Sequence, residues 1–430
     1  MSILSALNVS ILFLTQINSF SPSPLVSGCH SRLFRNINIQ KSYFSNYFSS
    51  IINSNSINQK LKISDSSFEN FLSPAIVLNG EFVHYVYDQT LEYTMQRYFD
   101  CPVKVYNCKF QNFPLGNFNG SVISATQRLD MYNVLFKNIA CNFGAICSSN
   151  QINGNYISFN DIRGKYASCF FTETSDKTAE NSMLNSAFNK INTEKDFGTF
   201  YHGGEDSFVL KSSNISNAYA KNYAAFKLKC SNVLLKENCF LSCKSNDING
   251  CAGFEKQNKL EIKDCVWKDI DVKELAIIST IVLHISNVVE CTITENIFTD
   301  IIHKNHYYIQ ALNVEKMVID ECCFRTSQEY SVLSLNSNVD SIDNDYNQKC
   351  FNIMNLNNIG WNLKRTATYN PLFDIQIMEV NTKSIPYINF FTVILQYVFK
   401  FLIFLLIAVG ILIIINIIEN KKNEIVLMSI

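Results

Sequence analysis

The chain has 430 residues, a formal net charge of -1 and 47% hydrophobic residues. A charge so close to zero gives no reason to expect nucleic acid as a partner, and so large an apolar fraction excludes a mainly disordered chain. The length is sufficient for a large core or for an elongated body of repeats.

The N-terminal segment, residues 1–20, contains the apolar run Ile3–Leu14. Its length is typical of the apolar region of a secretory signal peptide, and small and polar residues follow it near Ser19 and Ser21. A basic residue is not met until Arg32. The pattern predicts a cleaved signal peptide over residues 1–20, and the alternative is a first strand of the body.

Residues 21–350 repeat a short pattern, and each copy centres on one residue, usually aromatic, that we call the anchor. In "LEIKDCVWKDI" (Leu260–Ile270) the anchor is Trp267, and apolar residues stand seven and five positions before it and three after it. Successive copies are about 26 residues apart, a period typical of solenoids. The ten anchors are Phe68, Phe110, Phe136, Phe159, Phe188, Ile215, Phe240, Trp267, Phe298 and Phe324.

Each copy contains signals for three short strands. The two leading apolar positions alternate with polar ones, which predicts a strand, and a second strand leads into the anchor. A tight corner must lie between them, three residues before the anchor, where Asn and Asp tolerate a left-handed backbone. A third strand follows a variable loop and has a small-plus-apolar signature, which begins at Pro74, Gly144, Ser168, Gly198, Ala224, Ala252, Leu275 and Ser331.

Three short strands per repeat predict one coil of a parallel β-helix, since a single coil cannot bury its apolar face and stacked coils can. We therefore expect an all-β fold, a right-handed parallel β-helix solenoid of about 11–12 coils, with the handedness that parallel crossovers prefer. Leucine-rich repeats are disfavoured because their register and helical returns are missing, and a propeller needs longer units. The irregular segment Asp340–Cys350 predicts the end of the coils, with a cap and stalk over residues 351–385.

The C-terminal region contains the almost uninterrupted apolar run Phe401–Ile418. At ~1.5 Å per residue this run nearly spans a ~30 Å hydrocarbon core, and the residues before it can lengthen it. We predict one transmembrane helix over residues 390–418, with a buried core helix as the alternative. Lys421 and Lys422 follow, so the tail 419–430 is expected in the cytoplasm. These features predict a single-pass type I protein of the cell membrane with an extracellular solenoid.

A Phe-x-Asn motif followed by Gly-Ala-Ile, best seen in "FKNIACNFGAI" (Phe136–Ile146), resembles the repeats of polymorphic outer-membrane surface proteins and, more broadly, the pectin-lyase-like superfamily. With its apolar C-terminal segment the chain is more similar to the single-span β-helix surface proteins of protist parasites. The resemblance implies adhesion or recognition at the cell surface, with a host cell, matrix or glycan as ligand and no cofactor. The alternatives are a membrane-tethered polysaccharide lyase or hydrolase and a structural coat protein without a dedicated ligand.

The enzyme alternative requires converging acidic side chains. Two residues after the anchor, Asp161, Asp269 and Asp300 are weak catalytic candidates, and other coils have Asn or Lys there, which is typical of an outward column. We therefore expect a protein that is not an enzyme. The corner column is acidic on four successive coils and could bind a divalent cation, although Lys236 and Lys263 can neutralise it. These weak metal candidates are Glu237, Asp264, Glu295 and Glu321.

Several further features have chemical potential. The loops expected to carry recognition are "YHGGED" (Tyr201–Asp206) and "IIHKNHYYIQ" (Ile301–Gln310). The sequons at Asn119 and Asn214 are candidate glycosylation sites. The chain has 15 cysteines, an odd count that leaves at least one outside any internal pair. Local disulfide candidates join Cys141 with Cys147 and Cys239 with Cys243, whereas Cys108, Cys265 and Cys322 share an interior column and are expected to pack in the core.

Overall fold

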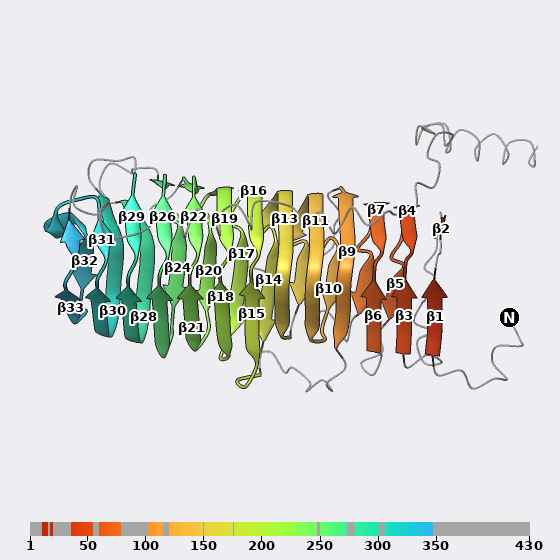
Figure 1. Ribbon diagram of the computed structural model, residues 1–430, viewed down its shortest axis with the longest axis horizontal. Helices are drawn as coiled ribbons and strands as arrows, with labels where there is room; N and C mark the ends of the chain where they lie inside the picture. Colours follow the sequence, from red (N-terminus) through yellow and green to blue (C-terminus); the bar gives the residue numbers. More distant parts are fainter. Residues whose placement is uncertain are drawn as a thin grey trace, which may run out of the picture. The chain divides into compact units, whose positions relative to one another are not determined.

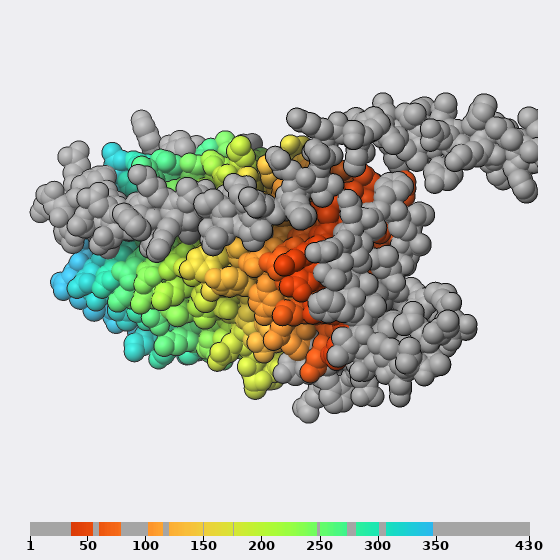
Figure 2. Space-filling view, turned by 45° about the vertical axis from the view of Figure 1, so that its right-hand side comes forward, coloured from red at the N-terminus to blue at the C-terminus, as the bar shows by residue number. Residues whose placement is uncertain are grey.

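A computed structural model describes residues 11–15, 18–19, 36–54, 60–78, 102–114, 120–148, 150–174, 176–246, 250–272, 280–300 and 306–346. The chain divides into two compact units, Met1–Tyr369 and Asn370–Ile430, and all of these residues belong to the first. They form a parallel β-solenoid of about ten turns, close to the expected number. Figure 1 shows the coils in chain order from β1 to β33, and Figure 2 shows them as successive bands of colour.

The strands form three parallel ladders, and five long strands run through a corner from one ladder into the next. The first ladder contains β1 (Ile11–Thr15), β3 (Asn36–Gln40), β6 (Lys60–Ser64), β9 (Val103–Phe113), β11 (Leu129–Phe143), β13 (Ile152–Tyr166), β15 (Glu180–Leu184), β18 (Ser207–Lys211), β21 (Asn232–Lys236), β25 (Lys259–Lys263), β28 (Thr280–Thr294), β30 (His306–Asp320) and β33 (Val339–Ile342).

The second ladder includes the anchors and continues β9, β11 and β13. Its other strands are β2 (Asn18–Ser19), β4 (Tyr43–Tyr47), β7 (Ser67–Phe71), β16 (Ala187–Thr193), β19 (Asn214–Ala220), β22 (Cys239–Leu241), β23 (Lys244–Ser245), β26 (Val266–Lys268), β27 (Asp271–Val272), β29 (Ile297–Thr299), β31 (Cys323–Phe324) and β34 (Asp345–Tyr346).

The third ladder contains the strands with the small-plus-apolar signature and enters β28 and β30 at their N-terminal halves. It consists of β5 (Ile52–Ser54), β8 (Ile76–Leu78), β10 (Ile123–Ala125), β12 (Ile146–Ser148), β14 (Phe170–Thr174), β17 (Phe200–Gly204), β20 (Phe226–Lys229), β24 (Ala252–Glu255) and β32 (Val332–Leu335). The signature at Leu275 lies outside the described residues, and β24 pairs instead with Leu283–Ser286 of β28. The third strand of that coil is therefore later than predicted.

The anchors stack inside the solenoid as expected. Ring centroids of Phe68 and Phe110 are 4.7 Å apart, and those of Phe136 and Phe159 are 4.6 Å apart, with nearly parallel planes in both pairs. The column extends one position further at each end, to Phe44 and to Tyr346. Offset stacking adds to the burial of each ring, so the aromatic column holds neighbouring coils in register.

The predicted corner is left-handed in every one of the ten repeats, with φ between 48° and 57° from Asn185 to Tyr156 and Glu237. A second left-handed column lies two residues after the anchor, for example at Asn70 and Asn138. Stacked amides also link successive corners: Asn133 Nδ2 donates to Asn107 Oδ1 at 3.0 Å. These corners explain why the chain is rich in Asn.

The residue that follows the predicted left-handed corner points inward, and its polarity accompanies the continuation or the break of the strand. Val134 and Ile157 pair with each other in the uninterrupted strands β11 and β13. Where Ser or Asn occupies this position, the strand breaks and the side chain binds the backbone instead. Ser186 Oγ accepts the N–H of Ile157 at 3.2 Å, and Asn296 Oδ1 accepts the N–H of Cys265 at 3.1 Å. Cysteine occurs at both kinds of corner.

Among the described residues the helical content is a single 3-10 turn, η1 (Gln328–Tyr330). None of their helices is long and apolar enough to cross a membrane. The predicted span 390–418, the cap and stalk 351–385 and the tail 419–430 lie outside the described part of the chain. At the N-terminus, β1 pairs in parallel with β3, which is the arrangement that the strand alternative for residues 1–20 expects.

Candidate functional site

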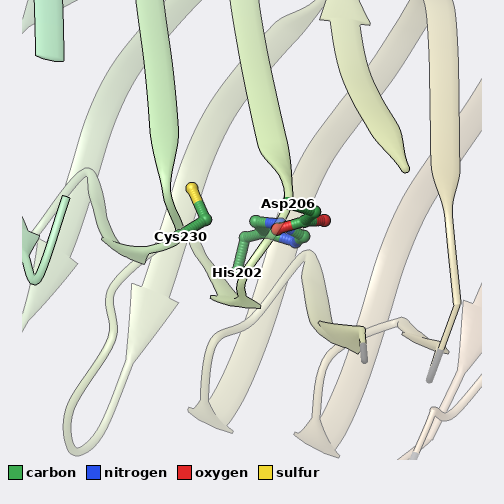
Figure 3. A group of neighbouring side chains, drawn as sticks. All are labelled: His202, Asp206 and Cys230. Carbon is green, nitrogen blue, oxygen red and sulfur yellow. The ribbon is translucent and has the colours of Figure 1, made fainter. Parts of the chain in front are cut away.

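Three buried side chains with different donor atoms meet inside the solenoid: His202 on β17, Asp206 at the corner after it, and Cys230 just after β20 (Figure 3). His202, Asp206 and Cys230 are each fully buried. One ligand atom from each lies within 4.8 Å of the other two. A nitrogen, an oxygen and a sulfur donor therefore share one space in the interior of the solenoid.

The local sequence explains how two polar residues reach the interior. Phe200 and His202 are two positions apart on β17, so both point inward, and His202 occupies the same column as Thr172 and Leu228 on adjacent coils. The chain then turns at Gly204, which has φ +154° and whose missing Cβ would lie 2.6 Å from the carbonyl oxygen of Thr174. This close turn returns Asp206 to the interior beside the imidazole.

Hydrogen bonds hold the imidazole and the carboxylate from both sides. His202 Nε2 lies 3.0 Å from each oxygen of Asp206, and His202 Nδ1 lies 2.6 Å from Thr172 Oγ1. Asn181 donates from Nδ2 to Asp206 Oδ2. Asn181 Oδ1 in turn accepts the backbone N–H of Ile152 at 2.8 Å. Buried polar groups are retained when they are satisfied in this way.

Cys230 is the third member of the cluster and is chemically quiet in this environment. Burial raises the pKa of its thiol well above the ordinary value, and the nearby Asp206 carboxylate raises it further. A thiol is a ligand or nucleophile as its thiolate, so Cys230 stays protonated unless a cation is bound beside it.

On the outer surface of the solenoid, the second column of left-handed corners borders a groove of about 450 Å³. Asn138 Nδ2 donates to Asn112 Oδ1 at 2.8 Å, and Asn112 Nδ2 donates to Glu69 Oε1 at 3.0 Å. The groove lining comprises Asn70, Leu72, Asn112, Phe113, Pro114, Asn138, Ile139, Ala140 and Arg163. We call it the amide groove, because a row of amides runs beside a row of apolar side chains.

The amide groove has an apolar and a cationic feature that are open to solvent. Leu72 is 45% exposed, and the Arg163 side chain is 72% exposed. The Arg163 guanidinium lies 3.7 Å from the Asp161 carboxylate, a distance at which an exposed pair is weak. Arg163 therefore remains accessible to a second anion.

The weak catalytic candidates occupy the same outer corner column further along the chain. Asp161, Asp269 and Asp300 are all left-handed and partly exposed. Asp269 and Asp300 lie on adjacent coils, and Arg325 forms an ion pair with Asp300. Asp161 follows the anchor Phe159, which is four coils from Trp267, so the structure does not bring the three carboxylates together.

The acidic corner column is a ladder of partly exposed side chains. Lys236 Nζ lies 3.7 Å from Glu237, and Lys263 Nζ lies 3.5 Å from Glu295. Burial and the Glu295 carboxylate raise the pKa of Asp264 to about 6, whereas the bond to Asp264 lowers the pKa of Glu295. Asp264 therefore keeps a proton at higher pH than an ordinary Asp does, beside an ionised Glu295. Glu321, the last of the four, follows on the next coil.

Parts of the two segments expected to be recognition loops belong to strands. In "YHGGED" the residues up to Gly204 belong to β17, and in "IIHKNHYYIQ" the residues from His306 belong to β30, where Tyr308 is buried. The loop assignment was wrong for these described residues, because they continue the period-two pattern of the third ladder. That same pattern, extended from Phe200 to His202, is the signal that would have placed His202 inside.

The predictions made for the cysteines and the sequons also need correction. Cys141, Cys147, Cys239 and Cys243 are all free, so neither predicted disulfide forms. The reason is that Cys141 and Cys243 point into the core, whereas Cys147 and Cys239 belong to separate clusters on the other side of the wall. As predicted, Cys108, Cys265 and Cys322 pack in the core.

The two sequons have different positions in the fold. Asn214 begins β19 and is 6% exposed, which leaves no space for a glycan in the folded solenoid. Asn119 lies outside the described residues.

The chain matches no protein-family model, no curated protein and no solved structure.

Proposed function

We propose that the protein is a membrane-anchored surface protein whose solenoid binds an extended acidic glycan in the amide groove. The observation that carries this proposal is the combination of amides, apolar side chains and an exposed cation in one groove of about 450 Å³. An apolar surface with a few directed polar groups is typical of binding sites.

A repeating ligand fits a repeating surface. Asn70, Asn112 and Asn138 present one amide per coil, and coils follow one another at the ~4.8 Å spacing of parallel strands. Each amide has two N–H donors and a carbonyl acceptor, and the ladder uses one donor of each, so the remaining groups can bind hydroxyls. Arg163 at the end of the row suits a carboxylate or sulfate group on the glycan.

The membrane anchor and the extracellular location come from the sequence. The apolar run Phe401–Ile418, the following Lys421 and Lys422, and the resemblance to single-span surface proteins support them. We propose in addition that the solenoid is right-handed and of the pectin-lyase-like type, which accords with the preference of parallel crossovers. An antibody to the solenoid should label unpermeabilised cells, and labelling that requires permeabilisation would contradict this location.

The binding test uses the full chain in detergent micelles with polygalacturonate and heparan sulfate as acidic probes and dextran as the neutral one. We expect the acidic probes to bind, and the double variant Asn112→Gly, Arg163→Gln to bind them about tenfold more weakly, a loss of ~1.4 kcal/mol. Glycine keeps the left-handed corner while removing the amide.

The matched control is Asn217→Gly, which removes an amide from the same column outside the groove, where Asn217 bonds Asn189. It should bind like the unchanged protein. Equal loss in both variants, or no binding of either acidic probe, would refute the proposed site. Release of reducing or unsaturated ends from polygalacturonate would instead favour the lyase or hydrolase alternative.

A further inference from the structure

We propose that His202, Asp206 and Cys230 form a buried structural site for a divalent metal ion of the zinc class. Histidine nitrogen, carboxylate oxygen and thiolate sulfur are all zinc ligands, and zinc sites of mixed ligands are tetrahedral. This site is separate from the amide groove and is independent of the binding role proposed for it.

The donor atoms already lie near the required distances. Zinc bonds of ~2.0 Å to nitrogen or oxygen and ~2.3 Å to sulfur place tetrahedral ligand atoms roughly 3.3 to 3.6 Å apart. His202 Nε2 and the Asp206 oxygens are 3.0 Å apart, and all three donor atoms lie within 4.8 Å of one another. An approach of the Cys230 sulfur by up to about 1.3 Å closes the site, and a bidentate Asp206 carboxylate can fill the fourth position of a distorted tetrahedron.

The surrounding hydrogen bonds have the arrangement that metal ligands need. Histidine ligands usually donate their other ring N–H to a neighbour, and ligating carboxylates are hydrogen-bonded in turn. Here Thr172 Oγ1 holds His202 Nδ1, and Asn181 Nδ2 holds Asp206 Oδ2. With Nδ1 protonated and bound to Thr172, the lone pair of Nε2 faces Asp206 and Cys230.

The charges also balance. A zinc dication with a Cys230 thiolate, an Asp206 carboxylate and a neutral His202 has no net charge, as an apolar interior requires. Binding converts the protonated Cys230 thiol to a thiolate and releases one proton to solvent. Because His202, Asp206 and Cys230 are fully buried, the ion enters during folding and joins two adjacent coils.

The test measures zinc by elemental analysis in the full chain, produced in zinc-supplemented medium and dialysed against a mild chelator. We expect about one zinc per chain. Cys230→Ser should lose it, whereas Cys265→Ser, the matched variant at another buried interior thiol, should keep it. Replacement of zinc by cobalt should give the visible absorption of a tetrahedral thiolate site in the unchanged protein and not in Cys230→Ser.

A second variant distinguishes loss of the metal site from misfolding of the chain. Thr172→Val keeps the volume of the side chain and removes the bond to His202 Nδ1, so it should weaken zinc binding by about 10–100-fold while the chain still folds. A folded, metal-free chain whose thermal midpoint does not rise with zinc would overturn the proposal. Equal loss of zinc from Cys265→Ser and Cys230→Ser would overturn it as well.

Discussion

The coils around β11 and β13 and the coils from β21 to β29 build the same corner in two different ways. In the first region Val134 and Ile157 follow the corner, and the strands run through it without a break. In the second region Asn238 and Asn296 follow the corner, and the strands are interrupted there. The same left-handed backbone is therefore compatible with an apolar or an amide interior.

The two kinds of corner differ in the partners of their backbone hydrogen bonds. A β-branched apolar residue has no side-chain group that can pair with the backbone of the neighbouring coil, whereas a buried Asn replaces the ladder with its own side chain. Asn296 accepts the N–H of Cys265 at 3.1 Å and donates to the carbonyl oxygens of Ile262 at 2.9 Å and Thr294 at 2.7 Å. Since buried backbone groups must be paired, each amide of this kind links two coils.

The largest expected effect comes from removing one of these amides. Asn296→Ala leaves three backbone groups without the partner they have now, and each unsatisfied buried group costs ~1–3 kcal/mol. We expect the free energy of unfolding to fall by about 3 kcal/mol or more, measured by urea denaturation of the full chain.

The control for this variant is Asn160→Ala, which removes an outward-facing amide whose contact with Asn189 is long, at 3.4 Å. A surface change of this kind should alter stability by ~0.5 kcal/mol or less. Similar losses in the two variants would show that the amides after the corners do not have the special role given to them here.

The repeat made most of this fold predictable from sequence. Phe136, Phe159 and the corner residues recur at fixed offsets, and such columns have a simple physical meaning when coils stack. The end coil at Tyr346 was missed because Ser341 replaces the apolar residue five positions before the anchor. The coil at Phe44 was predictable, since Ile37 and Ile39 keep the apolar columns there. The rule for the residue after the corner was also invisible, because Val134, Ser186 and Asn296 differ in polarity but occupy one column.

The buried cluster was harder to predict than the fold. His202 and Asp206 stand in a Gly-containing stretch that has the composition of a loop, and single polar residues at inward positions usually mark the end of a strand pattern. Their partners Thr172 and Cys230 are about one coil away in sequence, on either side. The register in which the coils stack determines which side chains meet. These contacts can be assigned to individual residues once the register of all three ladders is known.

A smaller, stabilising effect is expected at Tyr156, where the ladder of corner amides is interrupted. Tyr156 has φ +57° and is 46% exposed, and a bulky residue in this conformation costs roughly 1–2 kcal/mol. Tyr156→Asn should relieve most of this cost and lose a ring contact with Tyr132, so we expect a net gain of about 0.5–1 kcal/mol in urea denaturation. A loss of stability would show that the Tyr132 contact outweighs the strain.

The smallest expected effect is on the pH dependence of stability, which should differ between the amide corners and the acidic corners. Burial and Glu295 raise the pKa of Asp264 from 3.8 to about 6, so the folded chain holds this proton more tightly than the unfolded chain. The stability from this carboxyl is therefore present below about pH 4 and is lost as pH rises through 6. The lowered pKa of Glu295 acts in the opposite direction, because its contribution is lost as pH falls below its ordinary value.

Asp264→Asn should remove the contribution of the Asp264 carboxyl to the pH dependence of stability. It should keep the left-handed corner, since Asn is common at the same position in other coils. Relative to the variant, the unchanged protein should lose thermal stability between pH 4 and pH 7, by a shift on the order of 1 °C because the partly exposed carboxyl is screened. The matched change Asn185→Asp, in a partly exposed corner where Asn185 bonds Asn155 rather than a carboxylate, should lack an acidic partner. Its thermal midpoint should therefore fall less over the same pH range than that of the unchanged acidic pair, and an equal fall would mean that any carboxyl at these corners, paired or not, responds to pH alike.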